Sequence, residues 1–375
     1  MDLNLIWHYP RPELAATYLK LLSSGLVVST SIFAPRRTGK TVFLRQDLTP
    51  AARKAGFSVA YADLWQTRQS PGAALIRGLE EALEAKSVAS RAMAGLKRPV
   101  KALKGEAKVG EVSMGVQVEL AEPQKASPEM ALRIEDLIGQ LARKKPLLLL
   151  VDEAQELART KDAELIATAL RTAMTKHRDR VRVVFTGSSR SQLAHVFSNT
   201  DAPLYTVGAT VNDFPRLERE FIDFVVAKFK VACGRDLDPE MLWSAFLTFR
   251  QQPEPLLTAV VTMLMDPGLS AKQACANELA AHERAENHEG TWQALDALQR
   301  QLVLLIADDP QAKPFAKATL STLALRLGVS QLDAPSIQYA LRRLAEKNIV
   351  AKSARGVFEF ESDGFERWVK TLAEP

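Results

Sequence analysis

The first 215 residues alternate between short apolar runs and longer segments whose apolar residues recur at helical spacing. The short runs, rich in Val, Ile, Leu and Thr, lie at 26–33, 57–64, 146–152 and 181–186. Helical patterns lie at 11–24, 40–54, 70–83, 128–144 and 163–177. Fully apolar strands that alternate with helices form parallel sheets with helices on both faces. The pattern therefore predicts an α/β unit over residues 1–215.

Two other patterns follow. Only helical periods occur from 216 to 286, which predicts a small all-helical unit. Residues 287–375 contain three helical segments and then two short alternating segments, at 298–306, 320–327, 335–347, 349–352 and 357–360. The tripeptide Gly328-Val329-Ser330 connects the second and third helices tightly, as in a helix-turn-helix. This order predicts a winged-helix domain.

Residues 86–124 interrupt the α/β pattern. Segment 86–108 holds seven Lys or Arg against one acid, a local charge of +6. Segment 109–120 then alternates apolar and polar residues around Gly110 and Gly115, as in a hairpin. We interpret 86–124 as a basic insertion that projects from the α/β unit, with a solvated loop as the alternative.

Composition narrows the class of protein. Of 375 residues, 47% are hydrophobic and 25% charged, which is a globular balance, and the net charge of +5 suits an anionic ligand without requiring one. The cysteines, Cys233 and Cys275, are too few and too distant for a disulfide framework or a zinc cluster. No apolar run approaches the roughly 20 residues of a membrane helix, and the N-terminus lacks the basic region of a secretory signal. We therefore predict a cytoplasmic protein with no membrane partner.

Residues 34–41 match the phosphate-binding loop A-x-x-x-x-G-K-T, between a predicted strand and a predicted helix. In such a loop the backbone N–H groups point at phosphate oxygens, and Gly39 allows their close approach. Lys40 would carry its charge to the β- and γ-phosphates, and the Thr41 hydroxyl would bind Mg²⁺. The predicted nucleotide-binding residues are Ala34, Pro35, Arg36, Arg37, Thr38, Gly39, Lys40, Thr41 and Val42.

The apolar run at 147–151 ends in Asp152 and Glu153. At the carboxyl end of a parallel strand, Asp152 would lie beside the phosphate loop and hold Mg²⁺ together with Thr41. Glu153 would act as the general base toward the attacking water. The next strand ends in Gly187-Ser188-Ser189-Arg190, where we expect Ser188 to sense the γ-phosphate. Arg190 either contacts phosphate, in cis or in a neighbouring subunit, or is an ordinary loop residue.

These motifs give the chain a resemblance to the AAA+ ATPases. The motifs are A-P-R-R-T-G-K-T at 34–41, L-L-L-L-V-D-E-A-Q at 147–155 and V-V-F-T-G-S-S-R-S at 183–191. More narrowly, the chain resembles the archaeal-type and STAND-like branch that carries a C-terminal winged helix and is related to the origin-recognition ATPases. The resemblance implies an ATPase core at 1–215, a helical lid at 216–286 and a winged helix at 287–375. It also implies ATP as the nucleotide, with Lys40, Glu153, Ser188 and Arg190 as the catalytic candidates.

Two segments depart from that branch. An arginine of the finger type is expected after Pro203-Leu204-Tyr205, but this sequence has Thr206-Val207-Gly208. The Gly-x-Pro motif of the lid appears only as Arg250-Gln251-Gln252-Pro253, in which Arg250 is a candidate lid contact. Both departures argue against a ring mechanism with an arginine finger in trans. The oligomeric state stays open, a homo-oligomer included.

In the third helix of the winged-helix pattern, Ile337, Leu341 and Leu344 form the inward face. The outward face and the wing supply the candidate DNA contacts, which are Ser336, Gln338, Tyr339, Arg342, Arg343, Lys352 and Arg355. Segment 342–355 holds five basic residues against one acid, whereas 287–375 holds eleven of each, so a DNA footprint would be confined to one edge. Contact with a protein is the alternative role of such a domain.

The sequence thus predicts an ATP-hydrolysing molecular switch or motor that associates with double-stranded DNA through its winged helix. ATP binding would close the lid, and hydrolysis would reposition the winged helix and the basic insertion. The alternative is a STAND-like signalling switch that hydrolyses ATP slowly and contacts a protein partner. The departure at 206–208 favours that alternative.

Overall fold

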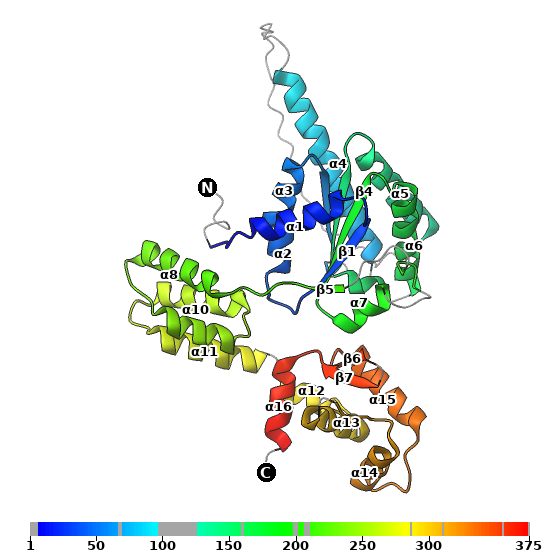
Figure 1. Ribbon diagram of the computed structural model, residues 1–375, viewed down its shortest axis with the longest axis vertical. Coiled ribbons are helices and arrows are strands. Elements are labelled where there is room, and N and C mark those ends of the chain that lie inside the picture. Colours follow the sequence, from blue (N-terminus) through cyan, green and yellow to red (C-terminus); the bar gives the residue numbers. More distant parts are fainter. Residues whose placement is uncertain are drawn as a thin grey trace, which may run out of the picture.

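A computed structural model of the chain describes residues 7–66, 70–96, 126–158, 161–197, 202–205, 211–285, 287–309, 311–354 and 356–373. The described residues form an α/β unit, a cluster of helices from α8 to α11, and a C-terminal helical unit with a short hairpin (Figure 1). In this described part, no helix is long and apolar enough to cross a membrane.

The α/β unit is built on one parallel sheet, in which the described strands follow the order β2-β3-β4-β1-β5. Their bounds are Ser29–Phe33 (β1), Ser58–Asp63 (β2), Leu147–Asp152 (β3), Val181–Gly187 (β4) and Val211–Asp213 (β5). Side chains along β3 alternate between two cores, because successive residues of a strand point to opposite faces. Leu149 packs on one face and Leu150 on the other, so the strand must be apolar throughout. The predicted parallel α/β sheet is confirmed.

Helices cover both faces of this sheet (Figure 1). One core contains residues of α4 (Pro71–Leu96), α5 (Pro128–Ala142), α6 (Lys161–Lys176) and α7 (Arg190–Phe197). The other core contains residues of α1 (Pro12–Ser23) and of the helical segment that follows the phosphate loop. Ser127 caps α5, since its hydroxyl accepts the Met130 N–H at 3.3 Å.

The helical segment after the phosphate loop is continuous but changes its winding. α2 (Lys40–Val42) passes into a π-helical stretch over Phe43–Leu48 and then into α3 (Thr49–Lys54). Pro50 at the start of α3 has no N–H for the helical ladder, and the Thr49 hydroxyl donates to the Leu44 carbonyl oxygen at 2.8 Å. The predicted helix at 40–54 is therefore present, with one widened turn.

Helix α4 is longer than its sequence pattern predicted. The pattern placed its end near Leu83 and an insertion from residue 86, but the helix continues to Leu96 and extends beyond the sheet (Figure 1). Residues 84–94 are rich in alanine and contain no Gly or Pro, so intrinsic propensity favours a helix there even though the apolar periodicity fades. The predicted hairpin at 109–120 lies outside the described residues.

Helices α8 to α11 pack around their own apolar cluster, which includes Phe221, Phe229 and Phe246. Their bounds are Arg219–Cys233 (α8), Pro239–Thr248 (α9), Pro253–Met265 (α10) and Ala271–Ala285 (α11). Trp7 and Tyr9, from the segment before α1, pack against the same cluster. The domain boundaries predicted at 215/216 and 286/287 stay predictions.

The C-terminal unit has the predicted winged-helix order, with a helix on either side that the sequence pattern did not predict. Its elements are α12 (His288–Gln293), α13 (Ala297–Asp308), α14 (Lys317–Leu327), α15 (Ala334–Glu346), β6 (Val350–Ala354), β7 (Val357–Phe360) and α16 (Asp363–Ala373). β6 and β7 pair antiparallel as the wing. The unpredicted α16 packs Phe365 and Val369 into the core of this unit, and Trp368 lies against that core.

The wing side of this unit contacts the α/β unit near the end of β4 (Figure 1). The Ser189 hydroxyl, just before α7, donates to Glu361 Oε1 at 3.0 Å. On α7, the Gln192 side-chain amide donates to the Asn348 side-chain oxygen. The winged helix is therefore tied by polar contacts to the segment that follows Ser188.

Candidate functional site

The phosphate loop runs from the end of β1 to the start of α2, and two of its residues adopt left-handed backbone conformations. Gly39 has φ of 87° and Arg37 has φ of 65°. A side chain at Gly39 would be strained by that φ, which explains the glycine. The Thr38 hydroxyl donates to the Pro35 carbonyl oxygen at 2.8 Å and closes the loop on itself.

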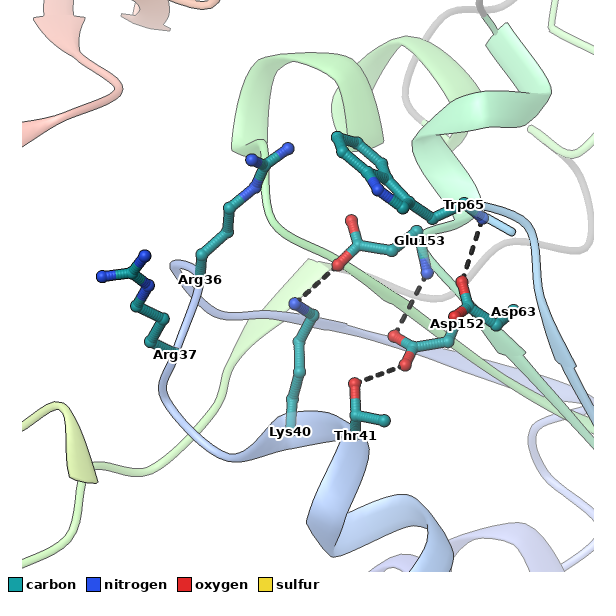
Figure 2. Close-up of a pocket in the computed structure, with 8 residues that line it drawn as sticks. All are labelled: Arg36, Arg37, Lys40, Thr41, Asp63, Trp65, Asp152 and Glu153. Carbon is teal, nitrogen blue, oxygen red and sulfur yellow. Dashed lines mark hydrogen bonds and ion pairs between the residues drawn. The ribbon is translucent and has the colours of Figure 1, made fainter. Parts of the chain in front are cut away.

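Lys40 is buried, with 6% of its surface exposed, and its ammonium forms an ion pair with Glu153. The distance from Lys40 Nζ to Glu153 Oε1 is 2.8 Å (Figure 2). A buried ammonium needs a counter-charge, because removing an unpaired charge from water is costly. The pair holds the two predicted catalytic groups in contact.

Asp152, at the end of β3, accepts hydrogen bonds from residues of α2, β2 and β4 and from the next residue of the chain. The Thr41 hydroxyl donates to Oδ2 at 2.6 Å and the Tyr61 hydroxyl to the same oxygen at 3.1 Å. The Thr186 hydroxyl donates to Oδ1, as does the Glu153 N–H at 3.2 Å. Burial, followed by the negative charge of Asp152, raises the pKa of Tyr61, so its hydroxyl stays protonated and remains a donor.

Glu153 stands at φ of 56°, in the left-handed region that non-glycine residues seldom occupy. Its Oε2 accepts hydrogen bonds from the Ser188 hydroxyl at 2.7 Å and from the Gln155 side-chain amide. Burial raises the pKa of Glu153, but the Lys40 ammonium and the hydrogen bonds outweigh burial and hold the pKa below its ordinary value. The carboxylate is therefore ionised at neutral pH.

Gln155 is a buried residue that sequence reasoning missed. Its amide nitrogen lies 3.3 Å from Ser188 Oγ as well as contacting Glu153. Gly187 makes room for it, since a Cβ at that position would lie 2.5 Å from Gln155 Oε1. The Q of the D-E-A-Q motif was visible in the sequence, but the contact depends on how β3 and β4 end.

The loop and the strand ends enclose a cavity of about 290 Å³ (Figure 2). Its lining residues are Arg36, Arg37, Lys40, Thr41, Asp63, Trp65, Asp152 and Glu153. Asp63, the last residue of β2, and Trp65, two residues further on, were not among the predicted site residues. Burial raises the pKa of Asp63, and the neighbouring carboxylates of Asp152 and Glu153 add to that effect. The Arg36 guanidinium lies over the Trp65 ring, 4.3 Å from its centroid.

The cavity fits a hydrated Mg²⁺ ion beside phosphates. Hydroxyl and carboxylate oxygens are the ligands that Mg²⁺ prefers, and Thr41 and Asp152 bring one of each together. Among the described residues, no cluster of three or more His, Cys, Asp or Glu side chains could enclose a metal by itself. Phosphate oxygens and water would complete the coordination shell of a Mg²⁺ ion bound at Thr41 and Asp152.

The helical unit approaches the phosphate loop at the start of α10. Arg37 Nε lies 3.6 Å from Glu254 Oε2, and a Cβ on Gly39 would lie 3.9 Å from the Pro253 ring. Gln251 has φ of 58°, the left-handed conformation for which glycine is favoured, at the glycine position of the expected Gly-x-Pro motif. Gln251 therefore adopts a backbone conformation that a glycine would adopt more easily, and the role of Arg250 stays a prediction.

The remaining predicted residues divide between described and undescribed parts of the chain. Ala34 is buried under the loop, whereas Val42 is 43% exposed and does not line the cavity. The side chain of Arg190 lies outside the described residues, as do Thr206, Val207 and Gly208.

On α15 the predicted faces are both found. Ile337, Leu341 and Leu344 are buried, and the five candidate DNA contacts of this helix are exposed, namely Ser336, Gln338, Tyr339, Arg342 and Arg343. Both arginines lie near Glu346, at 3.8 Å and 2.7 Å respectively. The side chain of Lys352 and all of Arg355 lie outside the described residues.

Comparison with known proteins identifies the fold. No protein-family model and no curated protein matches the sequence. Among solved structures, a Walker-type ATPase of Pyrococcus abyssi is similar with a TM-score of 0.59 at 15% identity, over 97% of this chain and 99% of that chain. The ORC2 protein of Aeropyrum pernix, solved as ADPNP–ADP complexes, is similar with a TM-score of 0.56 at 14% identity, over 99% of this chain and 98% of that chain. The chain therefore has the AAA+ P-loop ATPase fold of the origin-recognition-like proteins.

Proposed function

We propose that this chain binds and hydrolyses ATP in the cavity at the phosphate loop and uses the nucleotide state to position its winged helix. The observation that carries the proposal is one cavity lined by Lys40, Thr41, Asp152 and Glu153. Support for an adenine nucleotide comes from the ORC2 protein, which shares the fold and was solved with ADPNP and ADP. When bound, Mg²⁺ held by Thr41 and Asp152 would supply positive charge to the phosphates.

An incoming triphosphate must first break the Lys40–Glu153 ion pair. The negative charge of the triphosphate competes with Glu153 for the Lys40 ammonium, which then turns to the phosphates. Glu153 stays held at Oε2 by the Ser188 hydroxyl and the Gln155 amide. Its Oε1 is then available to orient a water and accept its proton, which is the role of a general base.

Two sets of polar contacts connect the nucleotide site to the helical unit and to the winged-helix unit. Arg37 meets Glu254 at the start of α10, so a change in the loop acts on the helical unit. Ser188 contacts Glu153 while Ser189 contacts Glu361 of the winged-helix unit. A change at the γ-phosphate site would therefore alter the contact that holds the winged helix.

Double-stranded DNA is the proposed partner of the winged helix. The support is the exposed face of α15, which combines hydrogen-bonding side chains with Arg342 and Arg343. A protein partner is the second candidate, because Glu346 offsets the charge of both arginines. Leu325 and Val329, 82% and 45% exposed, also add apolar surface beside the turn that leads toward α15.

The test is ATP turnover by the purified protein with and without double-stranded DNA. Glu153→Gln should lower turnover by about 10²- to 10⁴-fold, the usual contribution of a general base. Glu164→Gln, the same change on an exposed position of α6, is the control and should leave turnover unchanged. Stimulation by DNA supports the DNA-associated switch, and nucleotide binding without turnover in the presence of DNA favours the signalling switch. Failure to bind nucleotide would refute both.

A further inference from the structure

The phosphate loop carries two adjacent arginines, and both line the cavity. This matters because the sequence has Thr206-Val207-Gly208 where an arginine finger was expected. In phosphoryl transfer an arginine stabilises the charge that develops on the transferred group, and it can come from the same chain. Arg36 and Arg37 are the candidates for that role in the cavity.

The two arginines differ in direction and partner. Figure 2 shows Arg36 extending toward Trp65, on the side of the cavity where Glu153 lies, while Arg37 points away from it. Arg37 pairs with Glu254 at 3.6 Å, outside the catalytic cluster. Arg36 lies on the Trp65 ring at 4.3 Å and, within the described part of the chain, forms no ion pair. Of the two, Arg36 is therefore the one that extends toward the Glu153 side of the cavity and, among the described residues, has no acidic partner.

Trp65 lies in a turn closed by a local hydrogen bond. Its backbone N–H donates to Asp63 Oδ1 at 2.9 Å, which stabilises the turn after β2. An arginine stacked on an aromatic ring keeps its N–H donors in the plane of the guanidinium, free to meet a phosphate. The stacking contact is also weaker than a buried ion pair. The guanidinium can therefore leave the ring when an anion that attracts it more strongly enters the cavity.

We propose that Arg36 is a catalytic arginine supplied in cis, and that its guanidinium stacks on the Trp65 ring until a γ-phosphate enters the cavity. The inference rests on the proposed function. Water oxygen attacks the γ-phosphorus, the bond from that phosphorus to the β–γ bridging oxygen breaks, and ADP leaves with inorganic phosphate. Glu153 accepts the proton of the water, and Arg36 stabilises the negative charge on the γ-phosphoryl oxygens. Trp65 is a positioning residue that holds Arg36 in the resting state.

The first experiment compares Arg36→Ala, Arg36→Lys and the matched control Arg53→Ala, at an exposed position of α3, in ATP turnover. Arg36→Ala should lower kcat by about 10³-fold or more, the usual effect of a catalytic arginine, with a much smaller change in KM. Arg36→Lys should restore little, because an ammonium lacks the planar fork. Arg53→Ala should keep kcat within a few-fold of the unmodified chain. Equal kcat losses in Arg36→Ala and Arg53→Ala, or none in either, would overturn the proposal.

The second experiment needs no turnover and uses Trp65 as the reporter. Departure of Arg36 from the ring should change Trp65 fluorescence when a non-hydrolysable ATP analogue binds, but not when ADP binds. Trp65→Phe identifies the Trp65 signal among the five tryptophans. Arg36→Ala should lower affinity for the analogue about tenfold and leave ADP affinity unchanged. The same signal for both nucleotides, with unchanged affinities, contradicts the proposal.

The two experiments separate this inference from the proposed function. If the chain binds ATP without hydrolysing it, the enzymatic part of the proposed function fails, and the fluorescence and affinity differences still decide whether Arg36 meets the γ-phosphate. If hydrolysis proceeds and Arg36→Ala is fully active, the proposed function stands and the role of Arg36 is wrong. If neither nucleotide binds, the proposed function and the role of Arg36 are both refuted.

Discussion

The cavity at the phosphate loop and the exposed face of α15 are both rich in charge, but they are built in opposite ways. In the cavity, Lys40 comes from α2, and Asp152 and Glu153 come from the end of β3 and the residue after it. These residues are largely buried, and Lys40 and Asp152 each contact Glu153. On α15, Arg342 and Arg343 belong to a single helix, are exposed and share one nearby acid, Glu346. Charges in the cavity are therefore strongly coupled, whereas those on the helix act almost independently and are screened by salt. The difference predicts that a single change in the cavity has a far larger effect.

The largest expected effect is that of Lys40→Met. This substitution removes the ammonium that we propose binds the phosphates, and it leaves Glu153 buried beside an uncharged side chain. ATP turnover should fall by about 10³-fold, with weaker nucleotide binding, since preorganised charge contributes that much at such sites. Lys54→Met, on the exposed end of α3, is the control in the same steady-state assay and should behave as the unmodified chain. A fully active Lys40→Met variant would contradict the proposed site.

The second effect is expected at α15. Replacing Arg342 and Arg343 by Gln should weaken DNA binding about tenfold and reduce the slope of log K against log salt by about 0.9 for each phosphate that these arginines neutralise. The measurement is a fluorescence-anisotropy titration with duplex DNA between about 50 and 200 mM salt. Arg367→Gln on α16 removes an exposed arginine of the same domain and serves as control. If the double variant binds DNA with an unchanged slope, the DNA interface lies elsewhere.

The third effect concerns the hydrogen bond between Ser189 and Glu361. Glu361→Gln weakens a charge-assisted hydrogen bond of 3.0 Å, which should cost about 1 kcal/mol at the interface between the two units. We expect a few-fold increase in DNA affinity and a larger radius of gyration by small-angle scattering. Glu359→Gln, at an exposed position of β7 two residues before Glu361, is the control. Identical scattering and affinity for both variants would mean that this hydrogen bond does not restrain the winged helix.

The smallest effect is the pH dependence of stability without nucleotide. The pKa of Glu153 in the folded chain lies below its ordinary value of 4.5, so the Lys40–Glu153 pair stabilises the fold fully above that pH. The contribution is lost as pH falls through the depressed pKa. Chemical denaturation from about pH 7 to about pH 3 should show the unmodified chain losing more free energy of unfolding than Glu153→Gln. Parallel curves would indicate that the pair does not stabilise the fold.

The same contrast explains what the sequence could predict. The phosphate loop, the apolar strands and the inward face of α15 are local patterns, and each is found where it was predicted. Tyr61, Thr186, Gln155 and Trp65 were missed because their roles depend on the strand order, which brings the ends of β2, β3 and β4 together. No local pattern specifies that order.

The sequence pattern also failed to predict some helices and strands of the fold, for related reasons. The extension of α4 beyond Leu83 has helical propensity without an apolar stripe, so periodicity did not reveal it. The three residues of β5, Val211–Asp213, are too short to produce a strand pattern and are recognisable only by pairing with β1. For α16, the apolar face has meaning only once the winged-helix core that it covers is present.

The adjacency of Ser188 and Ser189 has a thermodynamic consequence. One peptide unit separates the hydroxyl that contacts Glu153 from the hydroxyl that contacts the winged-helix unit. Coupling between two binding equilibria is reciprocal, so a factor by which ATP changes the affinity of the winged helix for its partner must equal the factor by which that partner changes the affinity for ATP. A partner that withdraws Glu361 from Ser189 would thus act as an effector of nucleotide affinity from outside the cavity, without touching the nucleotide.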